Sequence, residues 1–308
     1  MYTRAWMLGL MIVLAPIAQA RAEDAASQQK SDCKQQEEQE GKGEKTSAVI
    51  CAVKAIFQSR IRRKKDTEPV EMTVGSPPML TDDTDTPGPG NWEINLGMNV
   101  GLAGGEHRTE FPTIDINYGR GDRLQFSYEV PYVSAAQSRA SADGSQHTVD
   151  VRGLGDSVIG VKYRFYDNTD TGLSFAVGPE VKFRTPGASK AISDNATSFM
   201  FPVMMTKEFE HASISANAGV EVSGGERHYF ASFGVGKRLT DHVALLAEIA
   251  GTDLNSPGDK HVLLNVGLRR KLSGTQSISG ALGRDIYEGD NTCGLTYISF
   301  FYQKLFGN

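Results

Sequence analysis

Residues 91–102 read NWEINLGMNVGL, and in this run apolar and polar side chains alternate without a break. Successive side chains of a β-strand point to opposite faces, so the alternation predicts a strand with one wholly apolar face. A run of this length matches the ~9–11 residues of a strand that crosses a membrane. The apolar face carries Trp92, Ile94, Leu96, Met98, Val100 and Leu102, and the other face carries Glu93, Asn95, Asn99 and two glycines.

The same alternation recurs as far as the C-terminus. Clear runs lie at 114–118, 124–132, 159–165, 173–183, 214–222, 229–235, 243–249 and 262–268, and weaker runs at 198–209, 275–286 and 295–306. Tight turns are expected at 119–122, 167–171, 210–211, 238–241 and 271–274, and longer polar loops at 103–110, 134–150, 185–196, 251–260 and 288–292. Only 223–226 is short where a long loop is expected. Alternating short and long connections are typical of an outer-membrane barrel.

The fold class predicted is all-β: a transmembrane antiparallel up-and-down β-barrel of about 12 strands over residues 91–308. A soluble β-sandwich is the alternative, since its strands also alternate. The strands here are longer than the ~5–6 residues usual in soluble sheets, and in lipid the sheet must close, because an open edge would leave backbone donors unpaired. Aromatic residues also collect at strand ends, where a lipid–water boundary favours them: Trp92, Tyr118, Phe165, Phe209, Tyr302 and Phe306.

The first 90 residues have a different composition. Residues 1–22 combine Arg4, an apolar stretch and small-x-small cleavage sites, and are predicted to be a signal peptide. The apolar stretch is shorter than the ~20 residues of a transmembrane helix, which is the alternative. Residues 23–90 are predicted to be a polar periplasmic segment, in which 46–61 has the spacing of a short helix and 79–90 has the composition of a linker. The helix packs on the rest of the chain or lies on a membrane surface, where its basic end suits anionic headgroups.

Charge and cysteine content limit the partners. The formal net charge is −5, and it becomes −7 if a cleaved signal peptide removes Arg4 and Arg21, so no nucleic acid is expected as a partner. Three cysteines do not make a disulfide framework. Cys33 and Cys51 can pair in an oxidising compartment, leaving Cys293 alone, or all three stay unpaired.

No catalytic constellation is visible in the sequence. It has no Gly-x-Ser-x-Gly, no His-Glu-x-x-His and no phosphate-binding loop, so neither an enzyme nor a cofactor is expected. The six histidines lack metal-ligand spacing, and no metal is expected. His228 and Ser232 share a strand face, but that face is predicted to point into the lumen. This argues against a hydrolase, whose catalytic residues would have to face outward together.

The candidate functional residues are polar side chains predicted to line the barrel lumen. Folding the chain across the turn at 167–171 places Asp156 roughly opposite Lys182, and such cross-strand ion pairs stabilise a sheet by ~0.2–1 kcal/mol. These side chains either brace the barrel interior or form a polar constriction that selects solutes by charge. The candidates for lining the lumen and contacting a solute are Asp115, Asn117, Gln125, Glu129, Asp156, Lys162, Arg164, Glu180, Lys182 and Arg184.

Four stretches between about residue 88 and residue 306 carry a resemblance: GPGNWEINLGMNV, IDINYGRGDRLQFSYEVPYV, GLGDSVIGVKYRFY and FAVGPEVKFRTP. They resemble the outer-membrane transporters known as the putative meta-pathway of phenol degradation family. The resemblance implies a β-barrel in the outer membrane and the passage of small, often aromatic compounds, and it implies no catalytic residues. A terminal aromatic commonly serves the barrel-assembly machinery as a signal, but here Gly307 and Asn308 follow Phe306.

The sequence therefore predicts a protein of the bacterial outer membrane, in contact with lipid, that lets small molecules cross passively. An even number of strands places the N- and C-termini together on the periplasmic side, the side of the short turns. The alternative function is a non-transporting structural or surface barrel that anchors a periplasmic tail.

Overall fold

The computed structural model describes residues 69–75, 77–103, 106–140, 146–193, 196–290 and 294–307. The chain divides into two compact units, Met1–Ile61 and Arg62–Asn308, and the described residues belong to the second. The signal peptide at 1–22, the helix at 46–61 and all three cysteines lie outside them, so these expectations stay predictions. Among the described residues, no helix has the length and apolar character needed to span a membrane.

The described residues form one sheet of fourteen β-strands. The strands are β1 Trp92–Ala103, β2 Glu106–Arg120, β3 Leu124–Ala140, β4 Gln146–Leu154, β5 Asp156–Asn168, β6 Leu173–Val177, β7 Glu180–Arg184, β8 Ser198–Glu208, β9 Ala212–Ser223, β10 Glu226–Thr240, β11 Val243–Thr252, β12 His261–Ser273, β13 Gln276–Glu288 and β14 Thr296–Phe306.

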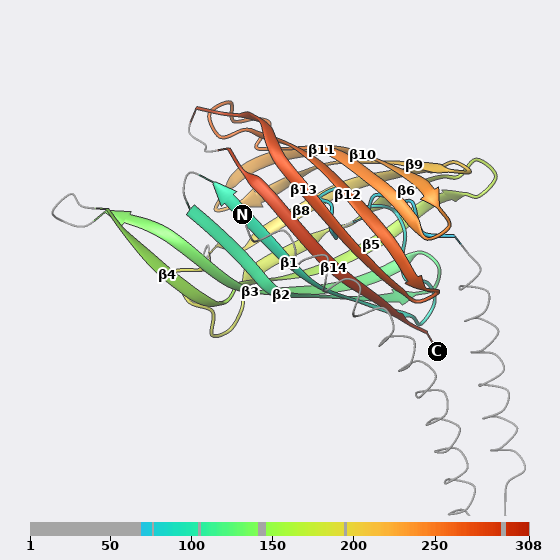
Figure 1. Ribbon diagram of the computed structural model, residues 1–308, viewed down its shortest axis with the longest axis horizontal. Coiled ribbons are helices and arrows are strands. Elements are labelled where there is room, and N and C mark those ends of the chain that lie inside the picture. Colours follow the sequence, from blue (N-terminus) through green and yellow to red (C-terminus); the bar gives the residue numbers. More distant parts are fainter. Residues whose placement is uncertain are drawn as a thin grey trace, which may run out of the picture. The chain divides into compact units, whose positions relative to one another are not determined.

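The sheet closes into a barrel, because β1 pairs with β2 on one side and with β14 on the other (Figure 1). Strands β4 and β5 both pair with β3 and are two halves of one barrel strand. Strands β6 and β7 both pair with β5 and β8 and are two halves of the next. Pro179 separates β6 from β7, since proline has no N–H for the ladder. The barrel therefore has twelve antiparallel strands, which confirms the predicted fold class.

The connections differ between the two ends of the barrel. At the end that holds Trp92 and Phe306, called the turn end below, neighbouring strands are joined by two to four residues. The opposite end, called the loop end, carries the longer connections 185–197 and 253–260.

Two expected loops, 103–110 and 134–150, are largely strand. Strand β1 ends at Ala103 and β2 begins at Glu106, so the first of these connections is short. Strand β3 continues to Ala140 and β4 begins at Gln146, so this hairpin projects beyond the barrel (Figure 1). The base of the hairpin is stabilised by a small apolar cluster of Val133, Ala135 and Ile192, which explains why the strands continue past the barrel rim.

The two faces of the sheet differ as the alternation predicts. The outer face is apolar and exposed: Leu282 and Ile286 have 59% and 58% of their surface accessible. So extensive a belt of apolar side chains is unfavourable in water, and it is the surface that lipid covers in a transmembrane barrel. The inner face carries small and polar side chains, and Asn95, Ser215 and Asn265 are fully buried there.

Residues 70–75 and 77–87, called the plug below, lie inside the barrel. The composition of 79–90 predicts a linker, and this prediction is wrong for these residues, because the lumen offers cations to their carboxylates and an apolar patch to their neighbours. Side chains from seven strands bond to the plug: Lys162 of β5, Ser174 of β6, Thr206 of β8, Ser213 of β9, Glu248 of β11, Arg269 of β12 and Ser299 of β14.

Candidate functional site

The plug enters and leaves the lumen at the turn end. The Val70 N–H donates to the carbonyl of Asp241 between β10 and β11 (2.8 Å), and the Gly90 N–H donates to the carbonyl of Gly119 in β2 (2.8 Å). Between these points, no backbone–backbone hydrogen bond joins the described plug residues to the wall. The plug is therefore a loop held by side chains, and it adds no strand to the sheet.

One side of the plug rests on an apolar patch of the wall. Inward-facing glycines leave room for it: a Cβ on Gly234 would lie 2.7 Å from Val74 Cγ1, and a Cβ on Gly236 would overlap the carbonyl oxygen of Met72. The patch and the plug together form a buried apolar cluster of Val70, Val74, Met79, Ala244, Leu246 and Ala281.

Glu248 of β11 holds the middle of the plug. Its two carboxylate oxygens accept hydrogen bonds from the backbone N–H groups of Leu80 (2.9 Å) and Thr81 (2.7 Å). The Asn265 amide of β12 donates a third hydrogen bond to the same carboxylate (2.6 Å). Only 2% of Glu248 is exposed, and a buried carboxylate is tolerated where several donors replace its water.

Arg269 of β12 holds the first half of the plug. Its guanidinium donates to the carbonyls of Thr73 (3.0 Å) and Gly75 (3.5 Å), and its Nη1 lies 3.6 Å from Glu71 Oε2. Arg269 is buried. A planar guanidinium can serve several oxygen acceptors at once, so this one side chain orders the backbone on both sides of Val74.

Lys162 of β5 holds the second half of the plug. Its Nζ lies 2.7 Å from Asp82 Oδ2 and 3.9 Å from Asp83 Oδ1, and it donates to the carbonyl of Asp83 (2.9 Å). Two residues along the strand, Arg164 donates to Asp85 Oδ1 (3.0 Å). Strand β5 therefore supplies two cations to the acidic stretch of the plug.

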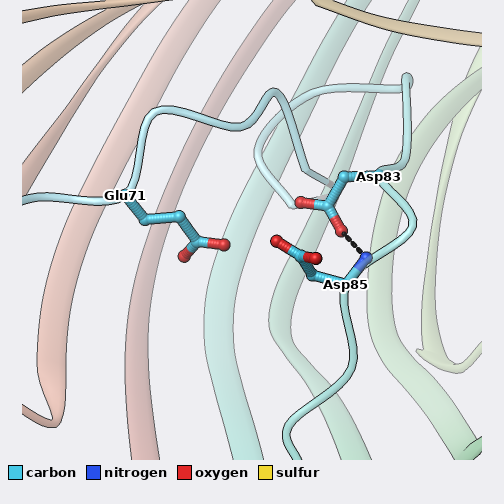
Figure 2. A group of neighbouring side chains, drawn as sticks. All are labelled: Glu71, Asp83 and Asp85. Carbon is cyan, nitrogen blue, oxygen red and sulfur yellow. Dashed lines mark hydrogen bonds between the residues drawn. The ribbon is translucent and has the colours of Figure 1, made fainter. Parts of the chain in front are cut away.

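Three carboxylates of the plug, those of Glu71, Asp83 and Asp85, converge inside the barrel (Figure 2). One oxygen from each lies within 4.8 Å of the others. Burial raises the pKa of Asp85 well above its ordinary value, and the charges of Asp83 and Glu71 raise it further, against the lowering effect of Arg164. Each carboxylate is already bonded within the chain; Asp83, for example, accepts from the Asp85 N–H (2.9 Å). We assign no metal ion to this group.

A cavity of about 340 Å³ remains between the plug and one side of the wall. Its charged lining is mostly acidic, with Lys162 and Arg269 as the basic members, and an apolar part lies on β5 and β8. The acidic lining consists of Glu71, Asp82, Asp83 and Asp85 from the plug and Glu93, Asp115, Glu129 and Glu180 from the wall; the apolar part consists of Val158, Val161, Met200 and Met204.

Six of the ten residues predicted to line the lumen border this cavity: Asp115, Asn117, Gln125, Glu129, Lys162 and Glu180. Four lie elsewhere: Asp156, Arg164, Lys182 and Arg184. Arg164 reaches the turn end, where it also donates to the carbonyl of Asp122, and Arg184 donates to the carbonyl of Ala188 in a loop. Contact with a solute stays a prediction for all ten.

The expected alignment of Asp156 with Lys182 is displaced by two residues. In the barrel Asp156 lies opposite Arg184, and Lys182 lies opposite Val158. The turn at the end of β5 occupies 169–172, slightly later than the expected turn, so every residue of β7 is displaced against β5. Lys182 also approaches Glu221 of β9, with 3.8 Å between Nζ and Oε1.

The aromatic residues predicted to mark a membrane boundary lie near the turn end, all on strands except Phe209, which directly follows β8. Trp92 and Tyr118 are cross-strand partners whose ring centroids are 4.7 Å apart. Phe165, Phe209 and Phe306 are about half exposed, and Tyr302 lies four residues before Phe306 in β14. Their position at a lipid–water boundary stays a prediction.

Sequence reasoning missed the residues that hold the plug, among them Glu248, Thr206 and Arg269. A signal was present in β11, which reads VALLAEIAGT and is apolar on both faces apart from one carboxylate. An apolar patch that faces the lumen is stabilised when another segment packs on it. A single buried carboxylate beside the patch requires hydrogen-bond donors. Both needs are met by the plug.

Two histidine–aspartate pairs brace the loop end. The Nδ1 of His228 lies 2.5 Å from Asp253 Oδ1, and the Nδ1 of His261 lies 2.7 Å from Asp285 Oδ2. The first pair joins β10 to the loop that follows β11, and the second joins the adjacent strands β12 and β13. Although His228 shares a strand face with Ser232, its described bond is to Asp253.

The chain belongs to a known family. The family described as "Putative MetA-pathway of phenol degradation" matches residues 78–295, which cover most of the barrel and the second half of the plug. The resemblance carried by the four sequence stretches is thereby confirmed. No curated protein sequence matches the chain closely enough to count as a relative.

Solved structures share the fold. The COG4313 outer membrane channel from Pseudomonas putida F1 is 15% identical, with a TM-score of 0.56 over 73% of this chain and 98% of that one. The KdgM porin in complex with disordered oligogalacturonate is 11% identical (TM-score 0.48, 69% and 98% covered), and the CymD monoaromatic hydrocarbon channel is 12% identical (TM-score 0.42, 71% and 90% covered). The similarity to the Pseudomonas channel shows the fold, that of an outer-membrane β-barrel.

Proposed function

We propose that the protein is a passive channel through which small molecules cross the bacterial outer membrane. The observation that carries the proposal is a cavity of about 340 Å³ inside a closed barrel whose outer face is apolar and whose lumen is polar. Solute passage follows the concentration gradient in this proposal, since the sequence contains no phosphate-binding loop that would couple it to nucleotide hydrolysis.

Small compounds with one aromatic ring are the proposed solutes. The family description names phenol degradation, and the cavity combines carboxylates with Met200 and Met204. Thioethers make favourable contacts with aromatic rings, and carboxylates accept hydrogen bonds from hydroxyl or amino groups. The six predicted lumen residues that border the cavity are the proposed solute contacts on the wall.

The turn end is proposed to face the periplasm, since outer-membrane barrels carry short turns on that side. Both termini of the barrel, at Trp92 and Phe306, then lie in the periplasm, together with the segment that precedes the plug. Phe306 is the proposed signal for the barrel-assembly machinery, and the aromatic residues near the turn end mark the inner lipid boundary.

A structural barrel without transport is the second candidate function. The plug favours it, because side chains from seven strands fix the plug across the lumen. A filled interior braces a barrel and leaves less room for a solute.

Reconstitution of the full chain into planar bilayers and liposomes separates the two candidates. A channel gives stepwise currents and lets liposomes swell in an uncharged sugar or a phenol, with rates that depend on the solute. The Lys162→Met variant is measured beside the wild type, because Lys162 holds the plug. Absence of current and swelling in both proteins would reject the channel in favour of the structural barrel.

A further inference from the structure

We propose that the plug is a self-blocking gate: while seated it closes the lumen, and a solute crosses only when the plug has withdrawn toward the turn end. The inference rests on the proposed channel function. It gives a function to residues 70–75 and 77–87, whose position inside the barrel is explained neither by the family nor by the fold.

The seated plug bridges opposite walls of the barrel. Lys162 lies on β5 and Arg269 on β12, and these strands are six places apart in a ring of twelve. Both side chains are buried and bond directly to the plug, Lys162 to Asp82 and Arg269 to the carbonyl of Thr73. The loop they hold therefore crosses the lumen from wall to wall, and a cavity of about 340 Å³ lies beside it.

The plug can leave without unfolding the barrel. The barrel closes through the β1–β14 ladder, which does not involve the plug. The plug enters beside Asp241 and leaves beside Gly119, both at the turn end, so it withdraws as a loop and no chain end has to thread through the lumen.

The seat favours the closed state at rest. Gly234 and Gly236 leave a groove for the plug backbone, and Val74 and Met79 cover the apolar patch around Leu246. Withdrawal exposes this patch to the lumen and leaves Lys162 and Glu248 without their plug partners, so both effects return the plug to its seat.

A reversible disulfide tests whether the plug must move. The pair Val74→Cys and Gly234→Cys places the two Cβ atoms next to each other. A Cβ on Gly234 would lie 3.0 Å from Val74 Cβ, and a disulfide needs ~3.5–4.5 Å, so the plug backbone must move away from β10 by about half an ångström for the bond to form. The pair is made in the full chain with Cys33, Cys51 and Cys293 replaced by serine, and Gly234→Cys alone controls for crowding and for the oxidant. We expect solute flux into liposomes to fall at least tenfold on oxidation and to recover on reduction, with the single variant insensitive to both.

A pair of lysine variants gives an independent measurement. Lys162→Met removes a bond between the wall and the plug, whereas Lys182→Met removes a pair with Glu221 that lies within the wall. We expect Lys162→Met to raise the open fraction of the channel at least fivefold and Lys182→Met to leave it within twofold of the wild type.

The outcomes separate the gate from the channel. Equal, non-zero flux in the oxidised and reduced disulfide protein, with equal open fractions in the two lysine variants, would overturn the gate and leave the channel function standing. Flux in none of these proteins, Lys162→Met included, would overturn the channel and the gate with it.

Discussion

Lys162 Nζ lies 2.7 Å from Asp82 Oδ2, and this ion pair ties the middle of a barrel strand to a segment that precedes the first strand. The lysine side chain is only 8% exposed. Removing one partner of a buried pair is costly, because the remaining charge stays in the interior without compensation. The pair therefore fixes where the plug sits more strictly than an exposed ion pair would.

We expect Lys162→Met and Asp82→Asn each to weaken the seating of the plug by ~3–5 kcal/mol, and the double variant to lose less than the sum. Hydrogen exchange of the amides of residues 77–87 measures the effect, with about tenfold faster exchange for each 1.4 kcal/mol. The matched cycle on Lys182 and Glu221, whose side chains are about a third exposed, should give ≤ ~1 kcal/mol. Additive effects at Lys162 and Asp82 would contradict the coupling.

The groove for the plug can be filled from the wall. A methyl group on Gly236 overlaps the carbonyl oxygen of Met72, so we expect Gly236→Ala to unseat the plug while the barrel stays folded. Limited proteolysis in detergent should then cut within residues 77–87 at least tenfold faster, and heating should still shift the band of the intact barrel on a gel.

Gly101→Ala is the matched control for the groove. It adds the same methyl group to another barrel strand, where the nearest atom is Leu295 Cδ1 at 3.4 Å. Its cleavage rate should equal that of the wild type. Equal cleavage of both alanine variants would mean that Met72 does not rest on Gly236.

The barrel itself was predictable because its signal is local and repeated. A strand such as 91–102 shows its two faces by alternation alone, and the lengths of the connections add independent evidence for the topology. What the sequence could not predict was the register between neighbouring strands. The position of the turn after β5 places Asp156 opposite Arg184, and the alternation of side chains does not show where within one or two residues a turn lies.

The plug was not predictable from periodicity, because it has none. Its residues MLTDDTDTPGPG have a composition that is usual for linkers, and their order comes from partners far away in the chain, such as Glu248 and Arg269. The composition of a segment indicates whether that segment can form a core by itself. It gives no information about the cations and the apolar patch that other strands supply to it.

The apolar outer face gives a prediction that depends on depth. Leu282 is 59% exposed in the middle of β13, whereas Leu272 is 42% exposed beside the turn that follows β12. We expect Leu282→Arg to destabilise the folded barrel in liposomes by ~2–4 kcal/mol and Leu272→Arg by ~0–1 kcal/mol. Urea unfolding followed by tryptophan fluorescence measures both. Equal losses would show that the outer face does not lie in lipid as proposed.

Asp85 makes the seating of the plug depend on pH. Its carboxyl has a raised pKa inside the barrel, through burial and through the charges of Asp83, Glu71 and Glu208, against Arg164. A group that holds its proton more tightly in the seated state stabilises that state at low pH, and this contribution is lost as the pH rises through the raised pKa. We therefore expect amide exchange in the plug, and solute flux with it, to increase with pH above the ordinary range of an aspartate.

The Asp85→Asn variant tests whether Asp85 causes the pH dependence, since an amide keeps the shape of the side chain and cannot ionise. The variant should show a flatter pH profile, with the plug seated at neutral pH as firmly as the wild type is at acidic pH. Asp122→Asn, a change of the same kind at an exposed turn residue beside Arg164, should keep the wild-type profile. A profile that survives in Asp85→Asn, or one that runs in the opposite direction in the wild type, would assign the response to a different group.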